Sequence, residues 1–150
     1  MKKLIKNIDY LESENCKMYI IPNTFAPKDY KEYFINKSNP DEKYAGLYIL
    51  IGDKNQFYIG HTIDPIKRIE KHKKEFSWKK ALVFVYEDTD NPEIHLDGID
   101  VQYLEFLSFK TAYNNNYRKN KKGADPVYIK PAERQLMNDF FLQIIKLTNI

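Results

Sequence analysis

The chain has 150 residues, of which 43% are hydrophobic and 30% are charged, with a formal net charge of +3 and a pI near 8.7. This balance excludes a disordered chain and predicts one globular domain with a core of its own. The mild positive charge is compatible with a polyanionic partner but does not require one.

Cys16 is the only cysteine, which excludes an intrachain disulfide and a cysteine-based zinc site. Charged residues interrupt the short apolar pieces near the N-terminus: Lys6, Asp9, Glu12 and Glu14. Because neither a secretory signal nor a membrane span tolerates such interruptions, we expect a cytoplasmic protein without membrane contact.

The first forty residues predict a short strand and a short helix. The strand covers residues 17–21 and ends at Pro22, and the helix covers residues 27–36, with a proline in its first turn. We expect residues 1–40 to form an N-terminal extension packed on the core, and residues 41–150 to form the main domain.

The centre of the chain predicts a β-hairpin followed by a helix. Two apolar runs at residues 45–51 and 56–59 flank a Gly-Asp-Lys-Asn turn. An Asp-Pro pair at residues 64–65 then supplies an N-cap and a first helical residue, and the helix should run to about residue 74.

A further strand is predicted at residues 81–86, and helices at about 100–113 and 131–148, with a polar Asn- and Lys-rich segment between the helices. The order is strand, strand, helix, strand, helix, helix. This order predicts a small α/β (α+β) domain in which helices flank a three-stranded sheet.

Arg68 and His72 are four residues apart, so on a helix they share one face. Arginine suits a phosphate because its planar guanidinium can bind two oxygens at once. The alternative is a surface arginine and an unrelated histidine on a lysine-rich helix.

Tyr48 and Tyr58 each lie in a predicted strand, two residues from a glycine that lets a backbone or a substrate approach closely. A tyrosine can act as a general base only if its pKa falls well below its usual value of about 10. A bound metal ion, or the charges of Arg68 and His72, would supply that effect. The alternative is two ordinary strand tyrosines.

Glu105 lies in an apolar helical segment, where a lone carboxylate needs a partner. Mg²⁺ often takes one carboxylate and completes its shell with waters and substrate phosphate, so Glu105 is a candidate metal ligand. A structural ion pair is the alternative.

Basic side chains form two clusters that would bind phosphates and make affinity fall with salt. Their members are Lys67, Lys71, Lys73, Lys74, Lys79 and Lys80 in the first, and Arg118, Lys119, Lys121 and Lys122 in the second. A solvated lysine surface is the alternative for each. Since the sequence has no zinc-finger or helix-turn-helix signature, specificity would come from another domain, a partner or DNA structure.

Five features in order resemble the GIY-YIG nuclease family. They are Gly46-Leu47-Tyr48, Tyr58-Ile59-Gly60, Arg68, His72 and Glu105. The resemblance covers about residues 44–120 and is to the standalone bacterial or phage branch, with the arginine and histidine spaced as in homing endonucleases. Leu47 replaces the usual isoleucine of the first motif.

The resemblance implies an antiparallel sheet and metal-dependent cleavage of DNA by one divalent ion, Mg²⁺ or Mn²⁺. Glu105 would bind the metal, and either Tyr58 or Tyr48 would activate the attacking water while the other orients it. Arg68 would stabilise charge on the phosphate, and His72 would assist the base or hold the tyrosine.

The family often places an asparagine after the metal-binding glutamate, and Asn120 is the first choice here, with Asn116 next. Members of this branch often carry a further small domain after the nuclease core, so we expect an additional C-terminal domain or a protein partner to supply specificity. The alternative function is a nucleic-acid-binding module that keeps the fold and cleaves little or not at all on its own.

Overall fold

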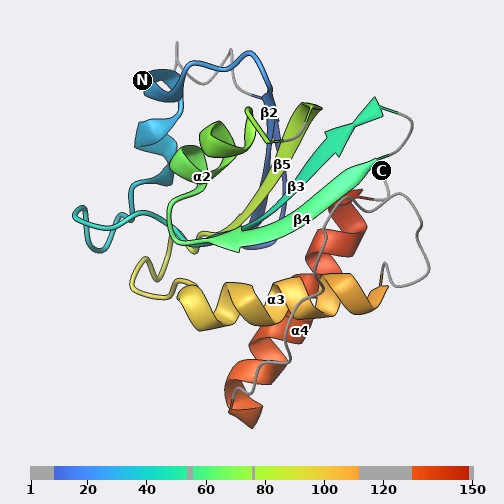
Figure 1. Ribbon diagram of the computed structural model, residues 1–150. Helices are drawn as coiled ribbons and strands as arrows, with labels where there is room; N and C mark the ends of the chain where they lie inside the picture. The colour runs from blue at the N-terminus through green and yellow to red at the C-terminus, as the bar shows by residue number, and fades with distance from the viewer. Residues whose placement is uncertain (1–8, 54–55, 76, 112–129, 149–150) are drawn as a thin grey trace.

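A five-stranded antiparallel sheet forms the centre of the computed structural model, which describes residues 9–53, 56–75, 77–111 and 130–148 (Figure 1). The strand order is β1-β2-β5-β3-β4. The strands are β1 (Asp9–Ser13), β2 (Cys16–Pro22), β3 (Gly46–Gly52), β4 (Phe57–Thr62) and β5 (Trp78–Tyr86).

The prediction of three strands is wrong, because β1 and β2 extend the sheet that β3, β4 and β5 form. β2 pairs with β5 from Cys16↔Tyr86 to Pro22↔Lys80, and β1 pairs with β2. Four of the five side chains of β1 are exposed, so that strand carries no apolar alternation for the sequence to reveal. The boundary at residue 40 between extension and main domain stays a prediction.

The predicted helix at residues 27–36 is replaced by two 3-10 helices, Pro27–Asp29 and Lys31–Phe34. Tyr30, between them, has a φ of −116°, which lies outside the α-helical range and interrupts a continuous helix. The three α-helices are α2 (Pro65–His72), α3 (Gly98–Thr111) and α4 (Pro131–Thr148). Within the described part of the chain, none of the helices has the length and apolarity needed to cross a membrane.

The sheet is covered on both faces, as Figure 1 shows with α2 on one side and α3 and α4 on the other. Alternate residues of β5 illustrate this, since Leu82 and Phe84 pack with α3 and α4, whereas Val83 and Val85 pack with α2. A strand buried on both faces reads as a continuous apolar run, which explains the strong strand signal at residues 81–86.

β4 is an edge strand of the sheet, and it contacts elements on both faces of the sheet. It leads directly into α2, while α3 packs against it from the other face. Side chains from β3, β4, α2 and α3 therefore converge at one open edge of the sheet.

Candidate active site

The connection from β4 to α2 is built as the Asp-Pro pair predicts. Asp64 is the N-cap residue and Pro65 the first helical residue, although the Asp64 side chain makes no capping hydrogen bond. Instead, the backbone N–H of Asp64 donates to Thr62 Oγ1 at 2.9 Å. Burial of Ile66 and Ile69 fixes the rotation of α2 and leaves Arg68 and His72 facing β3. The helix ends at His72, two residues earlier than predicted.

A chain of polar contacts joins α2 to β3. Arg68 Nε donates to Tyr48 Oη at 3.3 Å, and the same hydroxyl lies 2.8 Å from His72 Nε2. Tyr48 is 1% exposed and His72 3%. The structure thus brings together three of the residues that the sequence singled out. They come from β3 and α2, which β4 separates in the sequence.

The orientation of His72 assigns its proton. Nδ1 lies 3.5 Å from Glu75 Oε1, so we place the ring hydrogen on Nδ1, facing the carboxylate. Nε2 then accepts the hydrogen bond of the Tyr48 hydroxyl, which in turn accepts from Arg68. Glu75, Arg68 and His72 together fix the direction of the Tyr48 O–H bond.

The pKa values differ from those expected of an activated base. Burial raises the pKa of Tyr48 to about 12, and the opposing effect of Arg68 is smaller. Burial also lowers the pKa of His72, so this ring is neutral at neutral pH and does not supply the positive field expected of it. The pKa of Tyr58 is raised as well, again chiefly by burial.

Tyr58 lies beside this network on the edge strand. Its ring is nearly parallel to that of Tyr48, with an interplanar angle of 16° and centroids 6.3 Å apart. Its centroid is also 4.8 Å from the His72 ring. The two tyrosines and the histidine therefore form one aromatic cluster.

Gly60 is required by the position of Tyr48. The two residues are direct partners in the β3–β4 ladder. A Cβ built on Gly60 would lie 2.3 Å from both Cζ and Oη of Tyr48, closer than any real contact. The glycine of the second motif thus gives the tyrosine of the first motif room to reach α2.

Glu105 lies on α3 with its side chain 16% exposed, and it has the partner that the sequence required. Its Oε1 lies 3.1 Å from Nδ1 of His61, a half-buried residue of β4. The geometry does not meet that of a hydrogen bond, so the two atoms are in contact without one. The negative charge of Glu105 also raises the pKa of Tyr48 and of Tyr58, an effect smaller than that of burial.

The residues present suit a divalent ion of the kind that keeps most of its waters. Among the described residues no cluster of three histidine, cysteine or acidic side chains could hold a metal. An ion at Glu105 would therefore take most of its shell from waters and substrate, as Mg²⁺ commonly does. The buried, unbonded nitrogen of His61 beside the carboxylate adds a second donor atom to this position.

The predicted phosphate-binding lysines have different surroundings. Lys67, Lys71, Lys74, Lys79 and Lys80 are all exposed. Lys79 Nζ pairs with Asp53 Oδ1 at 2.7 Å, which partly neutralises it. The predicted residues Arg118, Lys119 and Asn120, and the second choice Asn116, lie outside the described residues.

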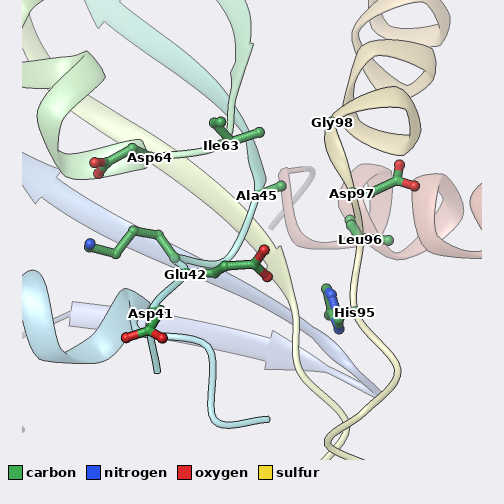
Figure 2. A pocket seen from close by; sticks show the side chains of 10 residues that line it. Asp41, Glu42, Ala45, Ile63, Asp64, His95, Leu96, Asp97 and Gly98 are labelled. Atoms are coloured by element: carbon green, nitrogen blue, oxygen red, sulfur yellow. The ribbon is translucent and has the colours of Figure 1, made fainter. Parts of the chain in front are cut away.

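A cavity of about 420 Å³ lies at the end of the sheet from which β4 leads into α2 (Figure 2). Carboxylates from three segments line it: Asp41, Glu42, Asp64 and Asp97. Figure 2 shows the segment with Asp41 and Glu42 on one side and the start of α3 on the other. Because none of the candidate catalytic residues lines this cavity and its charge repels phosphate, the candidate site is the open edge at β4 and not this cavity.

Two residues of the site were not among the sequence predictions. His61 follows the second motif directly, and Glu75 lies one turn beyond His72. The spacing of three residues between His72 and Glu75 is a signal that helix geometry offers. For His61 the only sequence signal is that it is a polar residue on the face of β4 that packs against the apolar helix α3.

Comparison with known proteins identifies the family. A sequence profile described as the GIY-YIG catalytic domain matches residues 44–122, more than half of the chain. Neither the comparison with curated proteins nor the one with solved structures found a match. The matched segment contains both tyrosine motifs, Arg68, His72 and Glu105. The chain therefore belongs to the GIY-YIG family, and its matched segment is a catalytic domain of the nuclease type.

Proposed function

We propose that this protein is a metal-dependent endonuclease that hydrolyses DNA phosphodiester bonds. The observation that carries the proposal is the contact chain Arg68–Tyr48–His72, with Tyr58 beside it and Glu105 on the helix that packs against the strand of Tyr58. A nucleophile-activating group, a phosphate-binding cation and a metal-ligating carboxylate are what this hydrolysis requires.

Tyr48 is the better candidate for the general base, because its own proton has a defined acceptor. The Tyr48 hydroxyl passes its proton to His72 Nε2, 2.8 Å away, as its oxygen takes a proton from the attacking water. No free phenolate is needed, so a pKa of about 12 is compatible with the step. Glu75 holds the His72 ring in the required tautomer, and Tyr58 orients the water.

Arg68 provides charge where it develops on the phosphate. Its Nε–H donates to Tyr48, and the terminal amino groups, which this bond does not use, would bind phosphate oxygens. The residue is exposed, so a substrate can reach it. A charge fixed in place before the reaction stabilises the transition state at no cost of reorganisation.

Glu105 would hold the divalent ion, Mg²⁺ or Mn²⁺. When bound, the ion supplies Lewis-acid stabilisation of the negative charge on the phosphate. Asn120 is proposed as a further polar residue of the site, on the strength of the family pattern alone. The exposed lysines Lys67, Lys71, Lys74 and Lys80 would bind the DNA backbone on either side, and a further domain or partner would select the sequence or structure cut.

Plasmid nicking tests this proposal. The full chain is incubated with supercoiled plasmid and Mg²⁺ or Mn²⁺, beside an EDTA control. Glu105→Ala should abolish nicking and leave DNA binding largely intact, whereas Glu70→Ala, which removes an exposed carboxylate of α2, should cut normally. Nicking that survives in Glu105→Ala or in EDTA would contradict the proposal.

One observation favours the second candidate, a nucleic-acid-binding module with little or no cleavage. The pKa values of both tyrosines are raised, so neither is activated in the metal-free protein. This candidate predicts salt-dependent DNA binding without cleavage of plasmid, branched, single-stranded or RNA substrates in either metal. Cleavage of one of these substrates that is lost in Glu105→Ala would exclude it.

A further inference from the structure

His61 has a buried ring nitrogen whose hydrogen-bonding capacity is not used. Nδ1 is inaccessible to solvent and forms no hydrogen bond, although it lies 3.1 Å from Glu105 Oε1. A buried polar atom in this state calls for a partner, because proteins rarely leave one unsatisfied. The imidazole nitrogen is also one of the commonest metal-ligating atoms in proteins.

The separation of the two atoms is that of neighbouring ligands on one ion. With metal–ligand distances of about 2.1–2.2 Å, two adjacent positions of an octahedron are about 3.0–3.1 Å apart. The observed distance from His61 Nδ1 to Glu105 Oε1 is 3.1 Å. The distance therefore allows one ion to contact both atoms.

The elements that carry the two residues also suit a shared ion. His61 belongs to the edge strand β4, and α3, which carries Glu105, packs against that strand. The side chains as a whole are 35% and 16% exposed, so the pair lies near the surface, where waters and a phosphate oxygen would complete the shell of an ion bound beside Nδ1. Along β4, His61 follows Gly60 and points away from the face that holds Tyr48 and Tyr58.

We propose that His61 Nδ1 is a second protein ligand, with Glu105, of the divalent ion. The inference rests on the proposed function, because it extends the metal site assigned there. A mixed nitrogen and oxygen donor pair favours Mn²⁺ and Co²⁺ over Mg²⁺, which prefers oxygen and water. Binding should therefore be tighter for Mn²⁺ than for Mg²⁺, and Co²⁺ should bind more tightly still.

Metal binding without DNA gives a readout that does not depend on cleavage. Mn²⁺ is titrated into the full chain, and the free ion is measured by electron paramagnetic resonance. His61→Ala should weaken Mn²⁺ binding by about tenfold or more and Mg²⁺ binding by a smaller factor. The matched control is His95→Ala, because the Nδ1 of His95 has a hydrogen-bond partner, the backbone oxygen of Glu93 at 3.0 Å. It should bind Mn²⁺ as the wild type does.

A second measurement on the unmutated protein guards against a variant that fails to fold. Sub-stoichiometric Mn²⁺ should broaden the ring proton signals of His61 strongly in NMR spectra, and those of His95 little. Equal broadening of both rings, no Mn²⁺ binding, or an unchanged dissociation constant in a folded His61→Ala would each overturn the proposal. An unchanged constant would leave His61 as a residue that only positions the Glu105 carboxylate.

Failure of this inference and failure of the proposed function are distinguishable. Mn²⁺ binding that requires both His61 and Glu105, in a protein that cuts none of the nucleic acids tested, supports the ligand pair and removes the nuclease assignment. Glu105-dependent nicking with metal affinity unaffected by His61→Ala removes the ligand pair and keeps the nuclease.

Discussion

Gly60 and Tyr48 face each other across the β3–β4 ladder, and the Tyr48 phenol occupies the space that a side chain at residue 60 would fill. A tyrosine with 1% exposure can thereby extend over its neighbouring strand and reach Arg68 and His72 on α2. The two sequence motifs are therefore one structural unit, in which the glycine of one determines where the hydroxyl of the other lies.

Gly60→Ala should displace the Tyr48 ring, since the new methyl group would lie 2.3 Å from Cζ and Oη. Overpacking of this kind costs about 1–3 kcal/mol in the free energy of unfolding, and nuclease activity should fall with it. Gly98→Ala is the matched control, because among the described residues its added Cβ would meet Ile63, at an ordinary contact distance of 3.5 Å. Equal stability of the two variants in urea unfolding would show that the Tyr48 ring can move aside to accommodate the methyl group.

Tyr48→Phe should separate catalysis from binding. The variant keeps the ring but leaves His72 Nε2 and Arg68 Nε without their shared partner, at a cost of about 1–3 kcal/mol. Turnover should fall by about 100-fold or more, as expected for loss of a general base, while DNA affinity is retained. Tyr86→Phe, which removes a buried hydroxyl on the other face of the sheet, should cut normally. Wild-type turnover in Tyr48→Phe would transfer the role of base to Tyr58.

Arg68→Ala should lower turnover by about 100- to 1000-fold, because it removes a fixed positive charge from the reacting phosphate. Arg68→Lys should recover little of this loss. A lysine cannot both donate to Tyr48 from the position of Nε and present two further donors to the phosphate. Single-turnover kinetics at saturating DNA would measure the effect, and wild-type rates in Arg68→Ala would exclude this residue from the mechanism.

His72 makes stability depend on pH in a defined direction. Its pKa in the folded protein is below the usual 6.5. As the pH falls, His72 therefore takes up a proton in the unfolded chain before it does so in the folded protein. The free energy of unfolding should therefore fall as the pH drops below about 7. It should stop falling once the pH is below the lowered pKa of His72 in the folded protein. Urea unfolding of wild type and His72→Gln between about pH 5 and 8 would isolate this contribution. Parallel pH profiles would contradict it.

The lysines of the α2 region should determine the salt dependence of DNA binding. Lys71→Ala combined with Lys74→Ala removes two exposed charges near Arg68. The slope of log K against log salt should become shallower by about 0.9 for each DNA phosphate that the variant no longer neutralises. Lys146→Ala, an exposed lysine of α4 on the opposite face of the sheet, should leave the slope unchanged. Identical slopes in all three proteins would place the DNA elsewhere.

Local sequence signals predicted the elements around the site well. The Asp-Pro pair placed the start of α2, and the bounds predicted for α4 are those observed, Pro131–Thr148. Helix periodicity also predicted that Arg68 and His72 share a face. These features depend on neighbours within a few residues, which a single sequence displays directly.

Long-range pairing is what the sequence did not reveal. β2 joins β5, whose residues lie far later in the chain, and no local pattern encodes that pairing. The contact of His61 with Glu105 depends on how α3 packs against β4, so it too appears only in the folded protein. Burial likewise argues against the expectation that His72 adds positive charge to the site, because burial lowers its pKa and burial follows from the fold.

The position of β4 at the edge of the sheet has a consequence for dynamics. Among the described strands β4 pairs with β3 alone, and edge strands open more readily than central ones. Fraying of β4 would part Tyr58 from Tyr48 and His61 from Glu105 in one event. Amide hydrogen exchange in residues 57–62 should therefore report how often the catalytic centre disassembles, and a nucleic acid bound along that edge should slow the exchange.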